Sequence, residues 1–302
     1  MKEPIKLIGN VASPYTRKMV AYLRYKRIPY EVIWGQPEEV LQKMNIEPPK
    51  PILLPVFILD RDGQATAVTD STPLIREFED KYPDRSVLPK DPALNFINFI
   101  LEDFGDEWCT KFMFHYRWHF DEDADNAGTI LPLGINSALK DDELAFFKEH
   151  FAKRQIDRLW VVGSNDDTAE FIDKSYKNVL SIFEDHFKNH PFLLGNFPTS
   201  CDFAVYGQFT QLVGFDPTPR RIAHEISPRT VAYVNTLDDR GGLDYVEENN
   251  TIDSLSNSIH DLFKELATSY VPTMIENHKA IREGKKEWSV DLAGYPWKQK
   301  SF

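Results

Sequence analysis

The chain has little cysteine, no long apolar run and no excess of positive charge. It contains only 2 cysteines, and Cys109 and Cys201 belong to no Cys-x-x-Cys pair and no zinc-ligand spacing. A disulfide framework is therefore not expected, and this cysteine usage favours a reducing, cytoplasmic compartment. The N-terminus has no secretory apolar region, and no apolar run approaches the roughly 20 residues that span a bilayer, so no membrane segment is expected.

The charge balance is acidic. There are 35 Lys and Arg against 47 Asp and Glu among 302 residues, which gives a formal net charge of -12. Long-range attraction to nucleic acid or to an anionic membrane surface is opposed by this charge, so neither is expected as a partner. With 42% hydrophobic and 13% aromatic residues the chain is predicted to be globular, and its length suggests about two domains.

The first part of the chain alternates short strand patterns with helical patterns. A strand, a helix and a second strand form a βαβ unit whose two strands should be parallel. Two strands joined at Asp62-Gly63 and a helix stopped by Pro83 follow it. The order βαβ and then ββα predicts a thioredoxin-like domain over residues 1–83. The predicted elements are strands at 5–9 and 30–34, helices at 14–26, 37–44 and 70–82, and two strands within 55–69.

The second part of the chain is predicted to be an all-helical domain over residues 93–302. Prolines and charges between 82 and 92 are typical of an interdomain linker. The stretch 121–140, with an acidic run and then Gly and Pro, is interpreted as a loop or an insertion. The predicted helices cover 93–120, 141–162, 168–189, 200–213 and 254–281. The fold class is therefore α+β with two domains.

Ser13 precedes Pro14 at the start of the first predicted helix, and this position has two explanations. Serine is a common N-cap, and proline is common at the first helical position because its missing N–H has no intrahelical partner there. Alternatively, the hydroxyl serves chemistry at the positive end of the helix dipole. The local sequence alone does not decide between a cap and a catalytic group.

Four separated stretches together resemble the cytosolic glutathione transferase superfamily, and especially its serine-type members of the tau class and related bacterial proteins. The stretches occur in the order expected for that superfamily and span most of the chain. They are "ASPYTRKMVAYLRYKRIPYEV" at 12–32, "LLPVF" at 53–57, "TDSTPLI" at 69–75 and "FLLGNFPTSCDFAVYG" at 192–207.

The resemblance implies a glutathione site built from three parts of the thioredoxin-like domain. It assigns Ser13 as the catalytic group, because its hydroxyl would donate to the glutathione thiolate and lower the pKa of the thiol. Tyr15 is a second candidate for contact with the tripeptide or its thiol. Leu54 would pair through its backbone with the tripeptide beside a cis-Pro55. Two further residues, Asp70 and Ser71, would bind the γ-glutamyl ammonium and carboxylate.

Two departures from the superfamily pattern affect this site. Relatives often carry a basic residue two or three positions before the proline, whereas this chain has Ile52 and Leu53 there and Lys50 further back. A charged contact to the glycine carboxylate of glutathione is therefore not expected. Asp70 also stands where superfamily members more often have glutamate.

The resemblance places an electrophile pocket beside the aromatic helix at 107–120. Trp108, Phe112 and His115 share one helical face with His119, and they are predicted to form the wall that accepts a hydrophobic co-substrate. The same face has a second interpretation as core. No third ligand accompanies the two histidines, so no metal is expected.

The predicted activity is glutathione transfer to a hydrophobic electrophile, as in detoxification, by a symmetric homodimer with glutathione as its co-substrate. Two alternatives are kept: a non-catalytic binding or scaffold protein of the same fold, and a glutathione-dependent peroxidase. Thr199 and Asp202 are expected to form a structural capping pair, with Cys201 buried between them.

Overall fold

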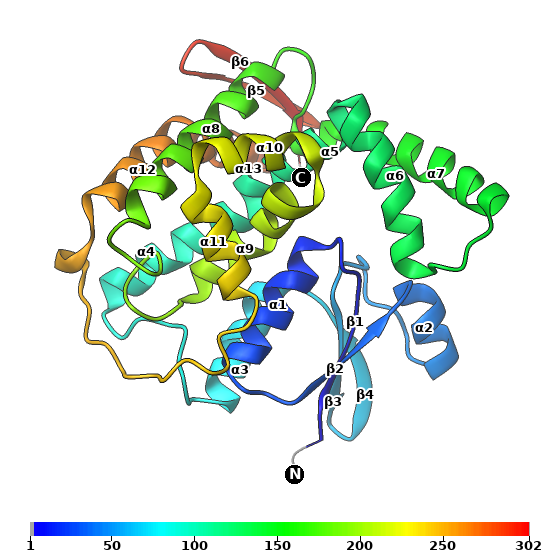
Figure 1. Cartoon of the computed structure of the whole chain (residues 1–302), viewed down its shortest axis with the longest axis horizontal. Coiled ribbons are helices and arrows are strands. Elements are labelled where there is room, and N and C mark those ends of the chain that lie inside the picture. Colours follow the sequence, from blue (N-terminus) through cyan, green and yellow to red (C-terminus); the bar gives the residue numbers. More distant parts are fainter. Residues whose placement is uncertain (1–2, 302) are drawn as a thin grey trace.

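The computed structural model describes residues 3–301 and begins with a four-stranded sheet flanked by helices (Figure 1). The strands are in the order β2-β1-β3-β4, with β1 parallel to β2 and antiparallel to β3. Each element that the sequence predicted in this part is present, so the thioredoxin-like arrangement is confirmed. The elements are β1 (Ile5–Gly9), α1 (Pro14–Tyr25), β2 (Tyr30–Trp34), α2 (Pro37–Met44), β3 (Val56–Arg61), β4 (Gln64–Val68) and α3 (Ser71–Lys81).

The two faces of the sheet pack into different cores. Leu7 and Phe57 belong to the main core, which α1 and α3 cover and which continues into the helical part of the chain. Ile8 and Val56 point to the other face and pack with Leu41 of α2 in a small separate cluster. This alternation follows from the period of two along a strand, which sends neighbouring side chains to opposite faces.

The rest of the chain is mainly helical. The helix predicted at 93–120 is interrupted by a π-helical turn, which separates α4 from α5. Another π-helical turn follows α9. The helices are α4 (Pro92–Asp103), η1 (Phe104–Trp108), α5 (Cys109–His119), α6 (Asp121–Ile135), α7 (Asp141–Ile156), η2 (Leu159–Val162), α8 (Ala169–His186), α9 (Ser200–Thr210), η3 (Gln211–Phe215), α10 (Pro217–Ile226), α11 (Pro228–Leu237), η4 (Ile252–Ser254), α12 (Asn257–Thr268) and α13 (Tyr270–Arg282). The predicted fold class is confirmed.

Helix α9 lies directly against α1 and begins with the predicted capping pair. The Thr199 N–H donates to the Asp202 carboxylate at 2.8 Å, and the same carboxylate accepts from the Tyr233 hydroxyl at 2.8 Å. Cys201 is fully buried, as predicted. Gly207 lets the two helices approach closely, because a Cβ at that position would lie 2.5 Å from the Pro14 carbonyl oxygen.

Residues 121–135 form helix α6, so the predicted loop at 121–140 is wrong for most of its length. Asp121, Glu122 and Asp123 stand in the first turn of α6, where the helix dipole favours negative charge. Further along, Ala127 and Leu131 pack in a cluster with Trp118 of α5. Tertiary packing thus outweighs the Gly and Pro signals in this stretch. Helices α6 and α7 stand together on the side of the molecule where α2 lies (Figure 1).

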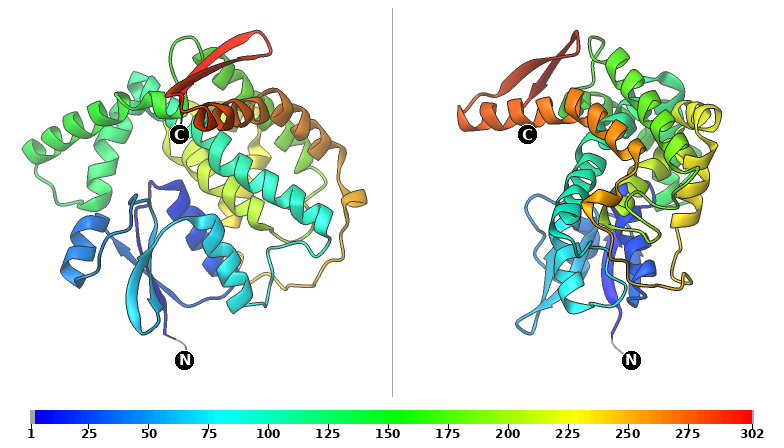
Figure 2. Two further views of the ribbon diagram at one scale, coloured as in Figure 1. Left: turned by 180° about the vertical axis from the view of Figure 1, so that it is seen from behind. Right: turned by 90° about the vertical axis from the view of Figure 1, so that its left-hand side faces the viewer.

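The domain predicted to be all-helical over 93–302 is not helical at its end, because a two-stranded hairpin follows α13. It consists of β5 (Glu287–Leu292) and β6 (Tyr295–Lys300), joined by a turn in which Ala293 and Gly294 have positive φ. Trp297 is buried against Trp108 of η1, with ring centroids 5.4 Å apart. The two views in Figure 2 show this hairpin beside α13, at the end of the molecule remote from the sheet. Within residues 3–301, no helix is long and apolar enough to cross a membrane.

Candidate active site

Three connections of the sheet lie at the same end of its strands: the turn after β1, the segment before β3 and the turn after β4. Ile8 of β1 pairs with Val56 of β3, so the chain after β1 lies beside the chain before β3. Phe57 of β3 pairs with Val68 of β4, so the chain after β4 ends at the same edge. These registers bring Ser13, the 54–55 peptide and the start of α3 to one side of the sheet.

Ser13 is the N-cap of α1 and is half-buried. Its Oγ accepts a hydrogen bond from the Thr16 N–H at 3.2 Å, while Pro14 occupies the first helical position without a donor. Ser13 therefore caps α1, as the first of its two explanations predicts. Because the cap uses only a lone pair of Oγ, the Ser13 hydroxyl proton is still available to donate to an anion at the positive end of the helix.

Tyr15, the second candidate at this helix start, points toward the helical domain. Its hydroxyl donates to the backbone carbonyl oxygen of Asp106 at 2.9 Å. Burial, together with the carboxylates of Asp106 and Glu107, raises the pKa of Tyr15 well above its ordinary value. The single hydroxyl proton is committed to a carbonyl, so Tyr15 has no proton with which to stabilise a thiolate.

The peptide between Leu54 and Pro55 is cis, as the resemblance implied. Pro55 is buried and Leu54 is half-buried just before β3 begins. Among the described residues, 3–301, neither the backbone N–H nor the carbonyl of Leu54 has a hydrogen-bond partner. An extended peptide lying along this edge would therefore find one backbone donor and one backbone acceptor.

Asp70 and Ser71 begin α3 in different environments. Asp70 is exposed, caps the helix by accepting from the Thr72 N–H at 3.3 Å, and has a φ of 81°. A non-glycine residue in this left-handed region is strained, and such strain concentrates at functional sites. Ser71 is buried, and its Oγ accepts from Lys18 Nζ at 3.1 Å, which leaves the hydroxyl proton for another acceptor.

Lys18 connects this site to the helical domain through a buried ion cluster. Its Nζ lies 3.0 Å from Glu102 and 2.6 Å from Asp106. Burial alone would lower the pKa of Lys18, but the two carboxylates outweigh burial and raise it. Burial raises the pKa of Asp106 to about 6, although Lys18 acts in the opposite direction. The Lys18 ammonium thus lies directly behind the Ser71 hydroxyl and keeps it oriented.

A second buried ion pair holds the turn that carries Ser13. The Arg117 guanidinium binds the Asp216 carboxylate at 2.9 Å, and another of its N–H groups donates to the Ala12 carbonyl at 3.3 Å. Gln211 accepts from Arg117 at 2.8 Å. Burial raises the pKa of Asp216 to about 6, although Arg117 lowers it. The helical domain therefore fixes the backbone immediately before Ser13.

The predicted electrophile wall of Trp108, Phe112 and His115 lies inside the core. All three side chains are 0% exposed. Trp108 donates from Nε1 to Ser175 Oγ at 3.0 Å, and His115 Nδ1 lies 2.7 Å from Ser164 Oγ. Burial lowers the pKa of His115 to about 3, so its ring is neutral. These residues therefore correspond to the core interpretation of this face, and the structure does not place them at a cavity.

A cavity of about 230 Å³ opens on the other side of the same helix, next to the start of α1. Its lining joins apolar side chains from α5 and η2 with cationic and acidic ones. The lining residues are Tyr15, Glu107, Thr110, Lys111, Phe114, Arg158, Val161 and Val162. Only Tyr15 of this set was predicted as a site residue, because the set comes from three segments that no local pattern brings together.

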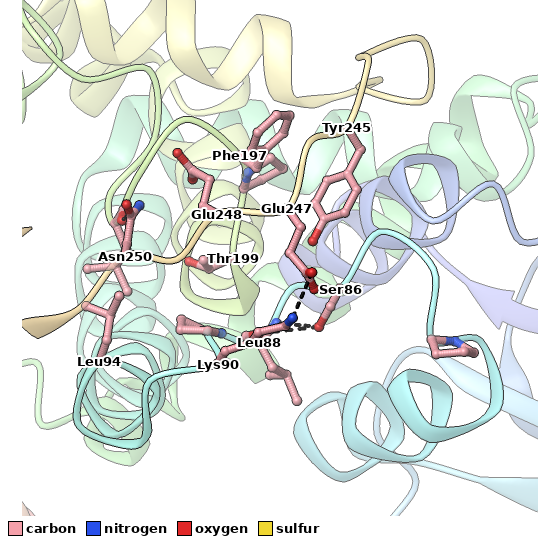
Figure 3. A pocket seen from close by; sticks show the side chains of 14 residues that line it. Ser86, Leu88, Lys90, Leu94, Phe197, Thr199, Tyr245, Glu247, Glu248 and Asn250 are labelled. Carbon is pink, nitrogen blue, oxygen red and sulfur yellow. Dashed lines mark hydrogen bonds and ion pairs between the residues drawn. The ribbon is translucent and has the colours of Figure 1, made fainter.

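Another cavity, of about 250 Å³, lies on the linker between the two domains (Figure 3). Lys90 and Glu247 face each other across it at 2.7 Å, and Phe197 packs edge-on against Tyr245. Glu248 is held by the backbone and side chain of Asn196. The charged groups of this cavity are thus engaged with each other or with the chain, and it shares no lining residue with the first cavity.

Within the described part of the chain, no group of three or more His, Cys, Asp or Glu side chains is placed to hold a metal ion. His115 and His119 stack with ring centroids 4.6 Å apart.

Comparison with known proteins agrees with the fold. Residues 7–86 match the family model of the glutathione S-transferase N-terminal domain. No curated protein sequence matches the chain. The beta-etherase LigF from Sphingobium sp. strain SYK-6 shares the fold at 16% identity and a TM-score of 0.52, covering 79% of this chain and 96% of that one.

Two further solved structures contain glutathione. A glutathione transferase family member from Pseudomonas fluorescens, with two glutathione molecules bound, is 15% identical over 79% of this chain and 92% of its own, with a TM-score of 0.50. A glutathione S-transferase of Ceriporiopsis subvermispora, in complex with glutathione, is 18% identical over 79% of this chain and 99% of its own, again at 0.50.

Residues 7–86 thus match the glutathione S-transferase N-terminal domain, and the chain shares the two-domain fold of the solved glutathione transferases. The predicted resemblance to the cytosolic glutathione transferase superfamily is confirmed.

Proposed function

We propose that this protein binds glutathione at the edge formed by Ser13, Leu54, Asp70 and Ser71 and transfers it to a second substrate. The observation that carries the proposal is the Ser13 hydroxyl, which keeps a free proton at the N-terminus of α1 while three junctions meet around it. The Leu54 backbone offers a donor and an acceptor to the cysteinyl residue of the tripeptide. Ser71, oriented by Lys18, offers a hydroxyl to the γ-glutamyl carboxylate.

The proposed reaction needs the thiolate form of glutathione. A thiol with an ordinary pKa near 8.5 is mostly protonated at neutral pH. Donation from Ser13 and the dipole of α1 favour the anion, and each unit of lowered thiol pKa corresponds to about 1.4 kcal/mol. The thiolate then attacks the electrophilic carbon of the second substrate, a carbon–sulfur bond forms, and the leaving group departs with the electron pair.

A homodimer belongs to this proposal, because α4 exposes two large aromatic side chains on one face. Phe96 is 62% exposed and Phe99 is 46% exposed. Apolar groups placed like this are typical of a surface buried by a second copy of the chain. Light scattering at micromolar concentration should therefore give about twice 35.0 kDa.

The thiolate absorbance of bound glutathione, followed against pH, tests the role of Ser13. In Ser13→Ala the thiol pKa should rise by roughly one unit or more, and conjugation of an aryl halide at neutral pH should fall accordingly. Glutathione affinity should change little, since Leu54, Asp70 and Ser71 are untouched. Losing the cap alone would cost about 0.5 to 2 kcal/mol of unfolding free energy and leave the thiol pKa in place.

The non-catalytic alternative makes a different prediction. If the fold only binds glutathione, the tripeptide binds but its thiol titrates as it does in water, both in the wild type and in Ser13→Ala. Superimposed titration curves would therefore contradict the catalytic role and favour the binding protein. A panel with a hydroperoxide beside the aryl halide would separate peroxide reduction from conjugation.

A further inference from the structure

The cavity beside the start of α1 is not the purely hydrophobic pocket that the sequence suggested. Phe114, Val161 and Val162 give the cavity an apolar lining, as suits a hydrophobic co-substrate. The lining also contains two cationic side chains, Lys111 and Arg158, and one carboxylate, Glu107. The lining therefore carries an excess of positive charge next to an apolar surface.

Lys111 packs near two aromatic rings. It is 2% exposed, and its Nζ lies 5.9 Å from the ring centre of Trp108 and 6.0 Å from that of Trp297. Ring faces stabilise a cation without neutralising its charge. The hairpin thus supports this wall, and Gln299 of β6 also donates to the Val161 carbonyl at 2.7 Å. Arg158, by contrast, is exposed, so it stands at the solvent side of the cavity.

The volume limits what the cavity can hold. A cavity of roughly 150 Å³ accommodates benzene in a protein core. At about 230 Å³, this cavity has room for one substituted aromatic ring or a branched chain of similar size. A buried cation beside such a ring favours an anionic substituent, because the interaction of opposite charges strengthens where water is excluded.

We propose that the second substrate is a small aromatic or branched molecule that carries one carboxylate. Its apolar body lies against Phe114, Val161 and Val162, and its carboxylate faces Lys111 and Arg158. This inference rests on the proposed function, and it narrows the substrate from hydrophobic electrophiles in general to anionic ones. It also makes Lys111 a specificity-determining residue. Lys111 lies two helical turns after Phe104, the first residue of η1.

Two matched aryl chlorides test the proposal, 4-chloro-3-nitrobenzoate and its neutral amide, 4-chloro-3-nitrobenzamide. Calorimetry on the full chain without glutathione measures their binding in the absence of reaction. At pH 7 the benzoate should bind at least about tenfold more tightly than the amide, which corresponds to one charge-assisted contact. Equal affinities would overturn the proposal.

Variants assign the preference to individual residues. Lys111→Met should reduce the preference for the benzoate to about twofold or less, and Arg158→Gln should reduce it less, because that side chain is exposed to water. Lys153→Met is the matched control, since Lys153 is an exposed lysine of α7 that pairs with Asp157 outside the cavity. Glutathione affinity should stay the same in all three variants. A preference that survives in Lys111→Met would also overturn the proposal.

A pH series provides a test that needs no variant. Burial lowers the pKa of Lys111 to about 8, with Glu107 acting in the opposite direction. Burial also raises the pKa values of Glu107 and Tyr15, the other titratable groups of the lining besides Arg158. The preference for the benzoate should therefore fall as the pH rises above about 8. A constant preference up to pH 9.5 would exclude Lys111 as the contact.

Turnover of the same two compounds separates this inference from the function on which it rests. During conjugation the thiolate displaces chloride, so a carbon–sulfur bond replaces the carbon–chlorine bond. The enzymatic rate for each compound is divided by the uncatalysed rate for the same compound before the benzoate and the benzamide are compared. Turnover of both compounds without preference would support conjugation and refute the anionic substrate. Preferential binding of the benzoate without turnover would support the cavity assignment and refute conjugation.

Discussion

The contact between Gly207 and α1 predicts that a single methyl group in the helical domain will disturb the candidate active site. A Cβ at position 207 would lie 2.5 Å from the Pro14 carbonyl oxygen and 3.1 Å from the Lys18 Cβ. Ordinary contacts between such atoms are roughly 3.5–4.0 Å, so the first turn of α1 would have to move by on the order of 1 Å. That turn begins with the cap residue Ser13.

The free energy of unfolding measures the first consequence of Gly207→Ala. Overpacking a core lowers the free energy of unfolding by about 1 to 3 kcal/mol, whereas replacing a helical glycine by alanine raises it by about 0.5 to 1 kcal/mol. A net loss of about 0.5 to 2 kcal/mol is therefore expected in urea denaturation at constant m-value. Gly134→Ala is the matched control, because a Cβ there meets nothing within 4 Å, and it should be neutral or slightly stabilising.

The thiol of bound glutathione measures the second consequence. A displacement of about 1 Å at a reacting group can cost roughly 100-fold in rate, so aryl halide conjugation should fall at least tenfold in Gly207→Ala. The thiol pKa should also rise toward its value in water. If Gly207→Ala and Gly134→Ala have the same stability and the same thiol titration, the close approach does not position Ser13 and the reasoning fails.

Three further predictions concern charged groups. Burial raises the pKa of Asp106 to about 6, so this carboxyl stabilises the fold at low pH and loses that contribution as the pH rises through 6. Relative to Asp106→Asn, the wild type should gain about 1 kcal/mol of unfolding free energy from pH 7 to pH 5. A difference that does not change with pH would contradict this. Arg117→Met leaves the Asp216 carboxylate buried without its partner and should cost about 3 to 5 kcal/mol at pH 7, with a smaller loss below pH 6 in parallel melts. Asp70→Asn keeps a cap that tolerates positive φ but removes the charge, so calorimetry should show glutathione binding weakened by about 1 to 2 kcal/mol with little change in stability. An unchanged affinity for glutathione would contradict the assignment of Asp70 to the γ-glutamyl ammonium.

The thioredoxin-like part was predictable because its signals are local. A proline at the first turn of α1, the Asp62-Gly63 turn and the apolar strands each act within a few residues, and each element was found where it was predicted. The resemblance then supplied the grouping of Ser13 with Asp70 and Ser71, which the strand registers support.

The aromatic helix at 107–120 shows what local sequence patterns cannot predict. Periodicity placed Trp108, Phe112 and His115 on one face, but it does not tell which element covers that face. The hairpin and α8 cover it, so the face became core. The alternation of Trp288, Val290 and Leu292 before a glycine turn was a signal for this hairpin that could have been used.

The charged residues of the site could not be inferred from local patterns. Lys111 and Arg158 come together only through the packing of α5 against η2, which no spacing in the sequence encodes. Lys18 is a partial exception, because it stands one turn before Tyr22 on the buried face of α1. A lysine on an apolar face indicates a buried acidic partner, although it does not identify Glu102 or Asp106.

The hairpin also sets an order in which the two halves of the site can assemble during synthesis. The segments that carry Ser13, Leu54 and Asp70 have left the ribosome once β4 and the start of α3 have been made, whereas Arg117, which donates to the Ala12 carbonyl, follows with the helical domain. Trp297, which supports the Lys111 wall, emerges only after the whole helical domain. Because domains near the N-terminus generally fold first, a nascent chain has its candidate active site well before the cavity beside α5 is closed. A ribosome stalled within α13 would therefore display a chain whose candidate active site has formed while the cavity beside α5 still lacks the hairpin that supports Lys111.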